Sequence, residues 1–157
     1  MTTGAAKYSQ IQMELTIAAD AATVWQALVD DIGQWWPADF YAGGEHGKRT
    51  FKFEAEPGGR MVELWDDGGG LLWGTVITVE PHKRLQALGT LFPNWGGPAL
   101  NYATWELEQK GSQTILRFSE STMGRMSDDG MEEKDKGWRF LMETMKAHIE
   151  GSDAPTW

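Results

Sequence analysis

The sequence predicts an α+β domain in which a curved antiparallel sheet of seven strands wraps around one long helix near the C-terminus. Three observations predict it. Segments that alternate apolar and polar residues with a period of two recur along the chain, and short Gly-, Pro- and Asp-containing turns separate most of them. The period becomes helical after residue 128, where it can supply a helix long enough to cover one face of the sheet.

The N-terminal elements are expected to be one strand followed by two short helices. Ser9–Ile17 alternates apolar and polar residues, which is typical of a strand with one buried face. Asp20 is the expected N-cap of a helix over Ala21–Asp30. A second helical turn is expected over Ile32–Trp36, because Pro37 prevents its continuation.

The middle of the chain contains six further segments with strand character, and the tight turns between them predict antiparallel neighbours. These segments are Arg49–Glu54, Arg60–Trp65, Leu71–Glu80, Arg84–Leu91, Leu100–Gln109 and Thr114–Glu120. The last helix is predicted over Asp128–Glu150, and Gly151 is expected to end it. The resulting order is β, α, α, six β, then α.

Length, composition and charge limit the class of protein to which the chain can belong. The 157 residues fit one domain, expected to span 1–157 with its core over about residues 10–150. No stretch is long enough for a membrane helix, no secretory signal is visible and no cysteine is present. The expected location is therefore the cytoplasm, without membrane contact. The formal charge of −9 repels phosphate backbones, so nucleic-acid binding is not expected.

Several short motifs, in this order and spacing, resemble those of the helix-grip superfamily, which includes START domains, the birch-pollen-allergen fold and polyketide cyclases (the SRPBCC group). Within it, the chain most resembles the family named after the activator of the heat-shock-protein-90 ATPase. The matching motifs are VWxxL in Ala21–Leu28, the WW turn in Trp35–Pro37, GxVxxxxPxxRL in Gly74–Leu85, GxxTxL in Gly111–Leu116 and GWxxxL in Gly137–Leu141. The resemblance implies a helix-grip fold with an internal cavity between the sheet and the last helix.

Two segments depart from the family pattern. Phe92–Pro98 is rich in Gly, Pro and Trp, where the resemblance implies a short hairpin. Met123–Glu133 is acidic and rich in Met, and is expected to lengthen the loop before the last helix. Both are expected at the mouth of the cavity, so the resemblance does not imply which ligand is bound.

No catalytic set, metal site or cofactor site is visible. The three histidines, His46, His82 and His148, lack the helical spacing of a zinc-binding pair and are expected to be solvated. The serines lack a nucleophile-elbow motif, and the glycine clusters lack the following Lys-Ser/Thr of a phosphate loop. We therefore expect no catalytic residues, no metal and no cofactor.

The expected cavity wall supplies the candidate ligand-binding residues. They are Arg49, Phe51, Phe53, Trp73, Trp95, Tyr102, Trp105, Phe118, Glu120, Trp138 and Met142. An inward Arg49 would have to pair with Glu120 or Glu63, either as a salt bridge at the rim of the sheet or as part of a group that orients a ligand.

Seven of the nine tryptophans divide into groups with different expected roles. Trp25, Trp36 and Trp138 are expected to attach helices to the sheet, and Trp138 is also a candidate ligand contact. Trp73 and Trp105 face either core or pocket, and Trp95 lies on the insert as a candidate lid. Trp157 is expected to be frayed.

Three functions remain open from the sequence. The first is non-enzymatic binding of a small, mostly apolar organic molecule, which the aromatic interior favours. The second is an enzyme of the polyketide cyclase or lyase type, in which polar pocket groups orient an intermediate. The third is a protein interaction of the chaperone ATPase-activator type, which the resemblance implies. A homodimer is possible, through Trp95 or the strand beginning at Ser9.

Overall fold

The computed structural model describes residues 4–157 and has the predicted order of elements. The helices are α1 (Ala21–Val29), α2 (Ile32–Trp35) and α3 (Asp128–Glu150), with 3-10 turns η1 (Ala38–Phe40) and η2 (Pro93–Trp95). The strands are β1 (Lys7–Ile17), β2 (Arg49–Phe53), β3 (Arg60–Trp65), β4 (Gly70–Glu80), β5 (Arg84–Leu91), β6 (Ala99–Lys110) and β7 (Gln113–Gly124). None of the helices in the described part of the chain has the length and apolar character of a membrane span.

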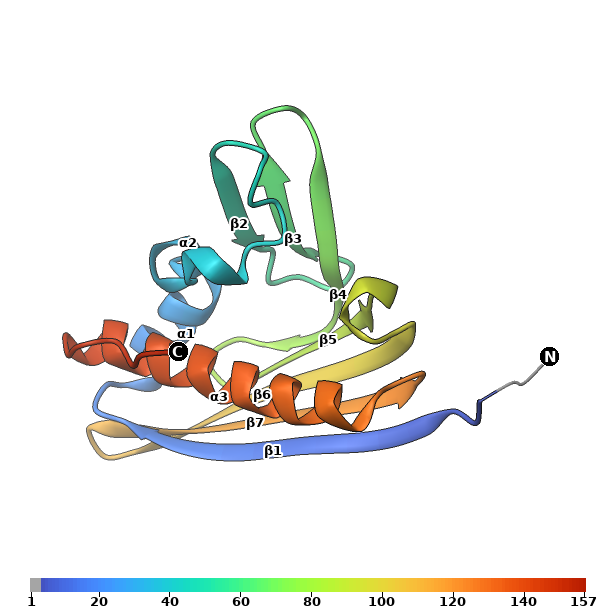
Figure 1. The fold of residues 1–157 in the computed structure, drawn as a ribbon. Helices are drawn as coiled ribbons and strands as arrows, with labels where there is room; N and C mark the ends of the chain where they lie inside the picture. The colour runs from blue at the N-terminus through green and yellow to red at the C-terminus, as the bar shows by residue number, and fades with distance from the viewer. Residues whose placement is uncertain (1–3) are drawn as a thin grey trace.

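The seven strands form one antiparallel sheet in the order β1-β7-β6-β5-β4-β3-β2. Chain neighbours are therefore sheet neighbours, except that β1 pairs with the last strand, β7. The sheet curves, and α3 runs along its concave side, while α1 and α2 lie between α3 and the hairpin of β2 and β3 (Figure 1). This is the predicted α+β helix-grip architecture.

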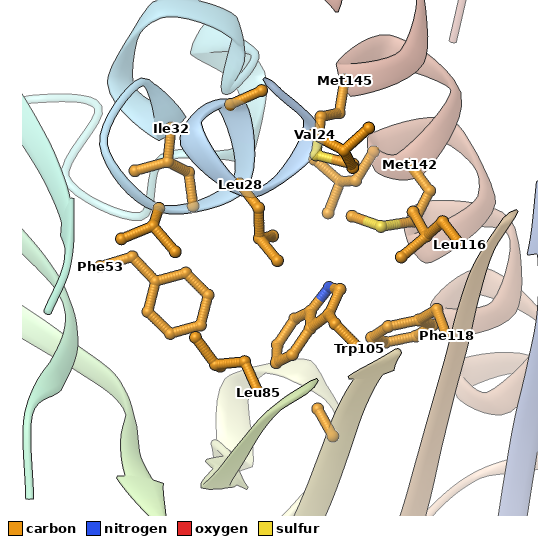
Figure 2. Packing of buried hydrophobic residues seen from close by; sticks show 14 of the residues in the cluster. Val24, Leu28, Ile32, Phe53, Leu85, Trp105, Leu116, Phe118, Met142 and Met145 are labelled. Carbon is orange, nitrogen blue, oxygen red and sulfur yellow. The ribbon is translucent and has the colours of Figure 1, made fainter. Parts of the chain in front are cut away.

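The core fills the space between the inner face of the sheet and the helices. Strand periodicity turns Trp105 and Phe118 inward, and helical periodicity turns Leu28 and Met142 toward them (Figure 2). Trp105 is almost fully buried and lies among side chains from α1, from α3 and from the strands. The apolar stripes read from the sequence therefore meet in one cluster.

The segment around the start of α3 differs from the prediction. Strand β7 continues to Gly124, because its pairing reaches Lys7 on one side and Ala99 on the other. Residues 125–127 alone connect it to α3. The expectation that Met123–Glu133 lengthens this loop is therefore wrong: its first residues belong to a strand paired on both sides, and most of the rest belong to the helix.

The Ser127 side chain caps α3, and its removal should weaken the helix. Its Oγ accepts a hydrogen bond from the Gly130 N–H at 3.1 Å. We expect Ser127→Ala to lower the free energy of unfolding by about 1 kcal/mol, measured by urea denaturation. Ser112→Ala, in an exposed turn, is the control, and an equal loss in both variants would contradict the capping role.

Candidate functional site

A pocket of about 760 Å³ lies between the inner face of the sheet and the first half of α3. Strands β3 to β7 supply its floor, and η1, η2 and α3 supply its rim. Trp95 lines it while keeping 43% of its surface exposed, so the pocket reaches the outside. The expected internal cavity is therefore an open pocket in this structure.

The pocket wall is strongly aromatic. Its aromatic residues are Trp36, Phe40, Tyr41, Trp73, Trp95, Trp105, Trp138 and Trp157. At the rim, the rings of Trp73 and Trp95 are stacked with centroids 5.3 Å apart and planes 7° apart. Deeper in, Trp138 lies against Phe118 with centroids 4.4 Å apart. Such rings offer a large apolar surface with few conformations of their own.

One buried ion pair stands in this wall. The Lys134 Nζ on α3 lies 2.6 Å from the Glu120 Oε1 on β7, and it donates a hydrogen bond of 2.8 Å to the Thr122 Oγ1. The side chains of Glu120 and Lys134 are only 2% and 14% exposed. Strand β7 directs Glu120 and Thr122 to the same face, because they are two residues apart. The pair is thus a fixed polar point in an apolar pocket.

Burial raises the pKa of the Glu120 carboxyl above its ordinary value of 4.5. Lys134 acts against this shift, as do the side chains of Trp138 and Thr122, but the loss of hydration is the larger effect. The carboxyl of Glu120 therefore holds its proton to a higher pH than an exposed glutamate does.

A second buried carboxylate, Glu63 on β3, fixes the opposite wall of the pocket. Its Oε1 accepts hydrogen bonds from the Gly43 N–H and the Trp65 Nε1, both at 2.7 Å. Its Oε2 accepts from the Ala42 N–H at 2.9 Å and from the Trp73 Nε1 at 3.4 Å. Since Ala42 and Trp73 both line the pocket, Glu63 positions this wall without lining it.

The loop that binds Glu63 requires glycine at position 43. A Cβ on Gly43 would overlap the Trp65 indole, which itself donates to Glu63. The ring of His46 is stacked on the Trp65 indole, with centroids 4.0 Å apart. His46 also contacts Asp67 at 2.6 Å. This histidine serves loop packing, and no group of three metal-ligating side chains occurs within residues 4–157.

The pocket brings together part of the residue set predicted from the sequence. Trp73, Trp95, Trp105, Trp138 and Glu120 all line it. The sequence left open whether Trp105 faces the core or the pocket. In the structure it belongs to the buried core cluster and also lines the pocket. Whether these residues bind a ligand remains a prediction.

The other predicted residues lie outside the pocket. Phe51, Phe53 and Phe118 on the sheet and Met142 on α3 are buried in the core between sheet and helices. Figure 2 shows Phe53, Phe118 and Met142 there. Tyr102 faces the outer side of the sheet, since it alternates with the inward Ala103 and Trp105.

The expected pairing of Arg49 with Glu120 or Glu63 is wrong. The Arg49 guanidinium lies 4.9 Å from the centroid of the Tyr41 ring, a cation–π contact. Glu120 has Lys134 as its cation, and Glu63 is satisfied by N–H donors instead. Each predicted partner of Arg49 is therefore already engaged.

Sequence reasoning missed several pocket residues. Lys134 precedes Trp138 by four positions on α3, and this helical spacing is a signal that places both on one face. Phe40 and Tyr41 follow Pro37 outside any periodic segment, so no pattern indicates them. Trp157 packs edge-on against Phe40, with centroids 5.2 Å apart, where a frayed end was expected.

Comparison with known proteins identifies the family. The model of the family described as Activator of Hsp90 ATPase homolog 1-like protein matches residues 18–150. No curated protein is significantly similar to the chain.

Solved structures with the same fold are distant in sequence. Protein MLL2253 from Mesorhizobium loti has 22% identity and a TM-score of 0.63, with 92% of this chain and 99% of that chain covered. Protein Mll3558 from Rhizobium loti has 21% identity and a TM-score of 0.67 over the same shares. The Aha1 dimer from Colwellia psychrerythraea has 20% identity and a TM-score of 0.64, with 90% and 96% covered. At these identities the likeness establishes the fold.

Replacing Glu63 with its neutral isostere should destabilise the protein. In Glu63→Gln, one oxygen becomes an NH2 group, which faces two N–H donors that it cannot accept. We expect a loss of about 2–4 kcal/mol in the free energy of unfolding, measured by urea denaturation, and a shift in tryptophan emission. Glu45→Gln, in the exposed part of the same loop, is the control. Equal stability of the two variants would contradict the role of Glu63.

The raised pKa of Glu120 predicts a pH dependence of stability. Between pH 4.5 and the raised pKa, the folded chain binds more protons at Glu120 than the unfolded chain. The free energy of unfolding from this group therefore falls as pH rises through that window. We expect Glu120→Gln to remove that decline in urea titrations at stepped pH.

Glu108 offers a control of opposite sign. Hydrogen bonds, first from Arg117 and then from Lys110, lower the pKa of its carboxyl below 4.5. Its contribution is present above that value and is lost as pH falls through the lowered pKa. Glu108→Gln should therefore change only the acid limb. A decline above pH 4.5 that persists in Glu120→Gln would refute the assignment to Glu120.

Proposed function

The chain belongs to the family described as Activator of Hsp90 ATPase homolog 1-like protein, and from that membership and its pocket we propose that it binds one small, mostly apolar organic molecule. The observation that carries the proposal is the aromatic pocket beneath α3. Its volume of about 760 Å³ lies within the range of pockets that enclose small molecules. Its walls combine aromatic rings with few polar groups, which is the usual composition of such sites.

Lys134 is the group in this pocket that would orient the ligand. An ammonium has three N–H donors, and within residues 4–157 two of them face Glu120 and Thr122. The third is available to a hydrogen-bond acceptor on a ligand, such as a carbonyl oxygen. A ligand with one acceptor at one end of a flat apolar body fits this arrangement.

The charges around the pocket favour an uncharged ligand. Glu120 already neutralises Lys134 at 2.6 Å, so a ligand carboxylate gains little from the ammonium. Asp39 and Glu133, which also line the pocket, would repel such an anion. A cationic ligand would lie close to Lys134. A neutral molecule avoids both the repulsion of an anion by Asp39 and Glu133 and the repulsion of a cation by Lys134.

Three naphthalenes of one shape test this proposal through quenching of tryptophan fluorescence. 2-Acetylnaphthalene carries an acceptor, 2-isopropenylnaphthalene replaces the oxygen with CH2, and 2-naphthoate carries a charge. We expect 2-acetylnaphthalene to bind best. In Lys134→Met, its affinity should fall by roughly tenfold, the value of one hydrogen bond to a charged donor, while that of 2-isopropenylnaphthalene stays unchanged.

Lys136→Met is the matched control, because Lys136 is exposed on the same helix and pairs with Glu133 instead of Glu120. No binding of any of the three probes, with a folded protein, would count against the pocket as a binding site for such molecules. Equal binding of all three before and after Lys134→Met would count against Lys134 as the orienting group.

The family match favours a second candidate, stimulation of a heat-shock-protein-90 ATPase. This function would use a protein contact and does not require the pocket. An ATPase assay with that chaperone separates the two candidates, since a protein that only binds a small molecule leaves the rate unchanged.

A further inference from the structure

The pocket holds a primary amine, and a carboxyl group lies in direct contact with it. Among the lysines of residues 4–157, Lys134 is the one that lines the pocket. Its side chain is 14% exposed, whereas that of Lys136 on the same helix is 62% exposed. Lysine amines that react with carbonyl compounds occur in such settings, where apolar surroundings and a neighbouring acid–base group replace water.

Glu120 is placed to take a proton from this amine. The Lys134 Nζ and the Glu120 Oε1 are 2.6 Å apart, so the proton moves along an existing contact. Burial favours the move, because it raises the pKa of the Glu120 carboxyl by removing hydration from the charged form. The Thr122 Oγ1 accepts a hydrogen bond of 2.8 Å from the same nitrogen, which holds the amine at this wall. The transfer leaves an uncharged amine, with a nucleophilic lone pair, beside a carboxylic acid.

Short side chains leave room for a flat ring next to the amine. Ala103 stands opposite Glu120 on the neighbouring strand, and Ala87 stands opposite Ala103 on the next strand. Gly74 and Gly89 form a further opposed pair. All four of these small residues line the pocket, so its floor is low beside the ion pair and can hold an aromatic ring.

We propose that Lys134 binds an aromatic aldehyde covalently, as an imine. The inference rests on the proposed function, because the ring must first enter the pocket. The neutral Nζ forms a bond to the carbonyl carbon, and a proton moves from the nitrogen to the carbonyl oxygen to give a carbinolamine. The protonated Glu120 then gives its proton to that hydroxyl, the C–O bond breaks, and water leaves. An aldehyde suits this confined amine better than a ketone does, because hydrogen is the smallest substituent on the carbonyl carbon.

The covalent product keeps the charge balance of the pocket. The imine nitrogen retains one proton and the positive charge that the ammonium carried, and Glu120 regains its negative charge. The two charges stay paired in the apolar wall, so the product contains no isolated buried charge. The released water has an exit at the open rim, where Trp95 is 43% exposed.

Reductive trapping with 2-naphthaldehyde and sodium cyanoborohydride tests the imine, because reduction turns it into a stable secondary amine. Intact mass spectrometry counts the naphthylmethyl groups, and peptide mapping locates them. With limiting aldehyde at neutral pH, we expect Lys134 to be labelled roughly tenfold faster, or more, than any exposed lysine. Excess 2-isopropenylnaphthalene, which has the same shape but no carbonyl, should protect Lys134 from the label.

Variants assign the two reacting groups, with the fold of each checked by circular dichroism. Lys134→Met should lose the pocket label, and Lys136→Met should keep it. Glu120→Gln should slow the trapping by roughly tenfold or more, because an amide neither takes the ammonium proton nor returns it to the leaving oxygen. A trapping rate that is unchanged in folded Glu120→Gln overturns the role of Glu120.

Peptide mapping of the unaltered chain decides the proposal even where a variant does not fold. Labels spread evenly over the exposed lysines overturn the imine at Lys134. Quenching of tryptophan fluorescence by 2-naphthaldehyde without a trapped Lys134 also overturns it, while the pocket remains a binding site. No quenching by either 2-naphthaldehyde or 2-acetylnaphthalene overturns both the imine and the proposed function.

Discussion

The pocket depends on a buried carboxylate that has N–H donors in place of a counter-ion. Glu63 is fully buried, and four N–H groups from three segments, the loop at Ala42 and Gly43, strand β3 and strand β4, converge on its two oxygens. An ionised group in this position is tolerable only when every strong acceptor site is used. The same bonds hold the loop at Ala42 and Gly43 beside Trp73, so one acceptor group determines where a whole wall stands.

The two buried carboxylates have different consequences because their partners differ. The donors to Glu63 belong to backbone and indole groups that cannot change charge, which makes this network a rigid support. Glu120 is instead paired with Lys134, whose ammonium contacts Glu120 and Thr122 within residues 4–157 and would, in the proposed function, direct its third N–H to a ligand. Preorganised support on one side and an unsaturated donor on the other is the arrangement expected of a binding site.

The fold could be predicted from the sequence because local sequence patterns determine most of its helices, strands and turns. Period-two strands, tight turns and the helical stripe of α3 each gave an element within one or two residues of its bounds, apart from the end of β7. The pocket could be predicted only in part. Periodicity indicates which side chains face inward, and so found Trp73 and Trp105, but it does not say which inward side chains line the pocket and which pack in the core, so the core residues Phe53 and Met142 were included.

Polar partnerships were the least predictable feature. Arg49 and Glu120 share the inward phase of their strands, yet β2 and β7 lie at opposite parts of the sheet, with four strands between them. Two of the four donors to Glu63, the backbone N–H groups of Ala42 and Gly43, lie in a loop that has no periodic pattern. Such contacts depend on tertiary distances, which a single strand pattern does not contain.

The pairing of β1 with β7 has a consequence for how the chain folds. The two strands are joined along their full length, with Lys7 opposite Gly124, although the whole of the remaining sheet lies between them in sequence. Contacts of such long range form slowly, because the intervening chain must be closed into a loop first. During synthesis β1 has no strand partner until β7 emerges. The first segment made is therefore among the last to find its place, and its alternating apolar residues need protection in the meantime.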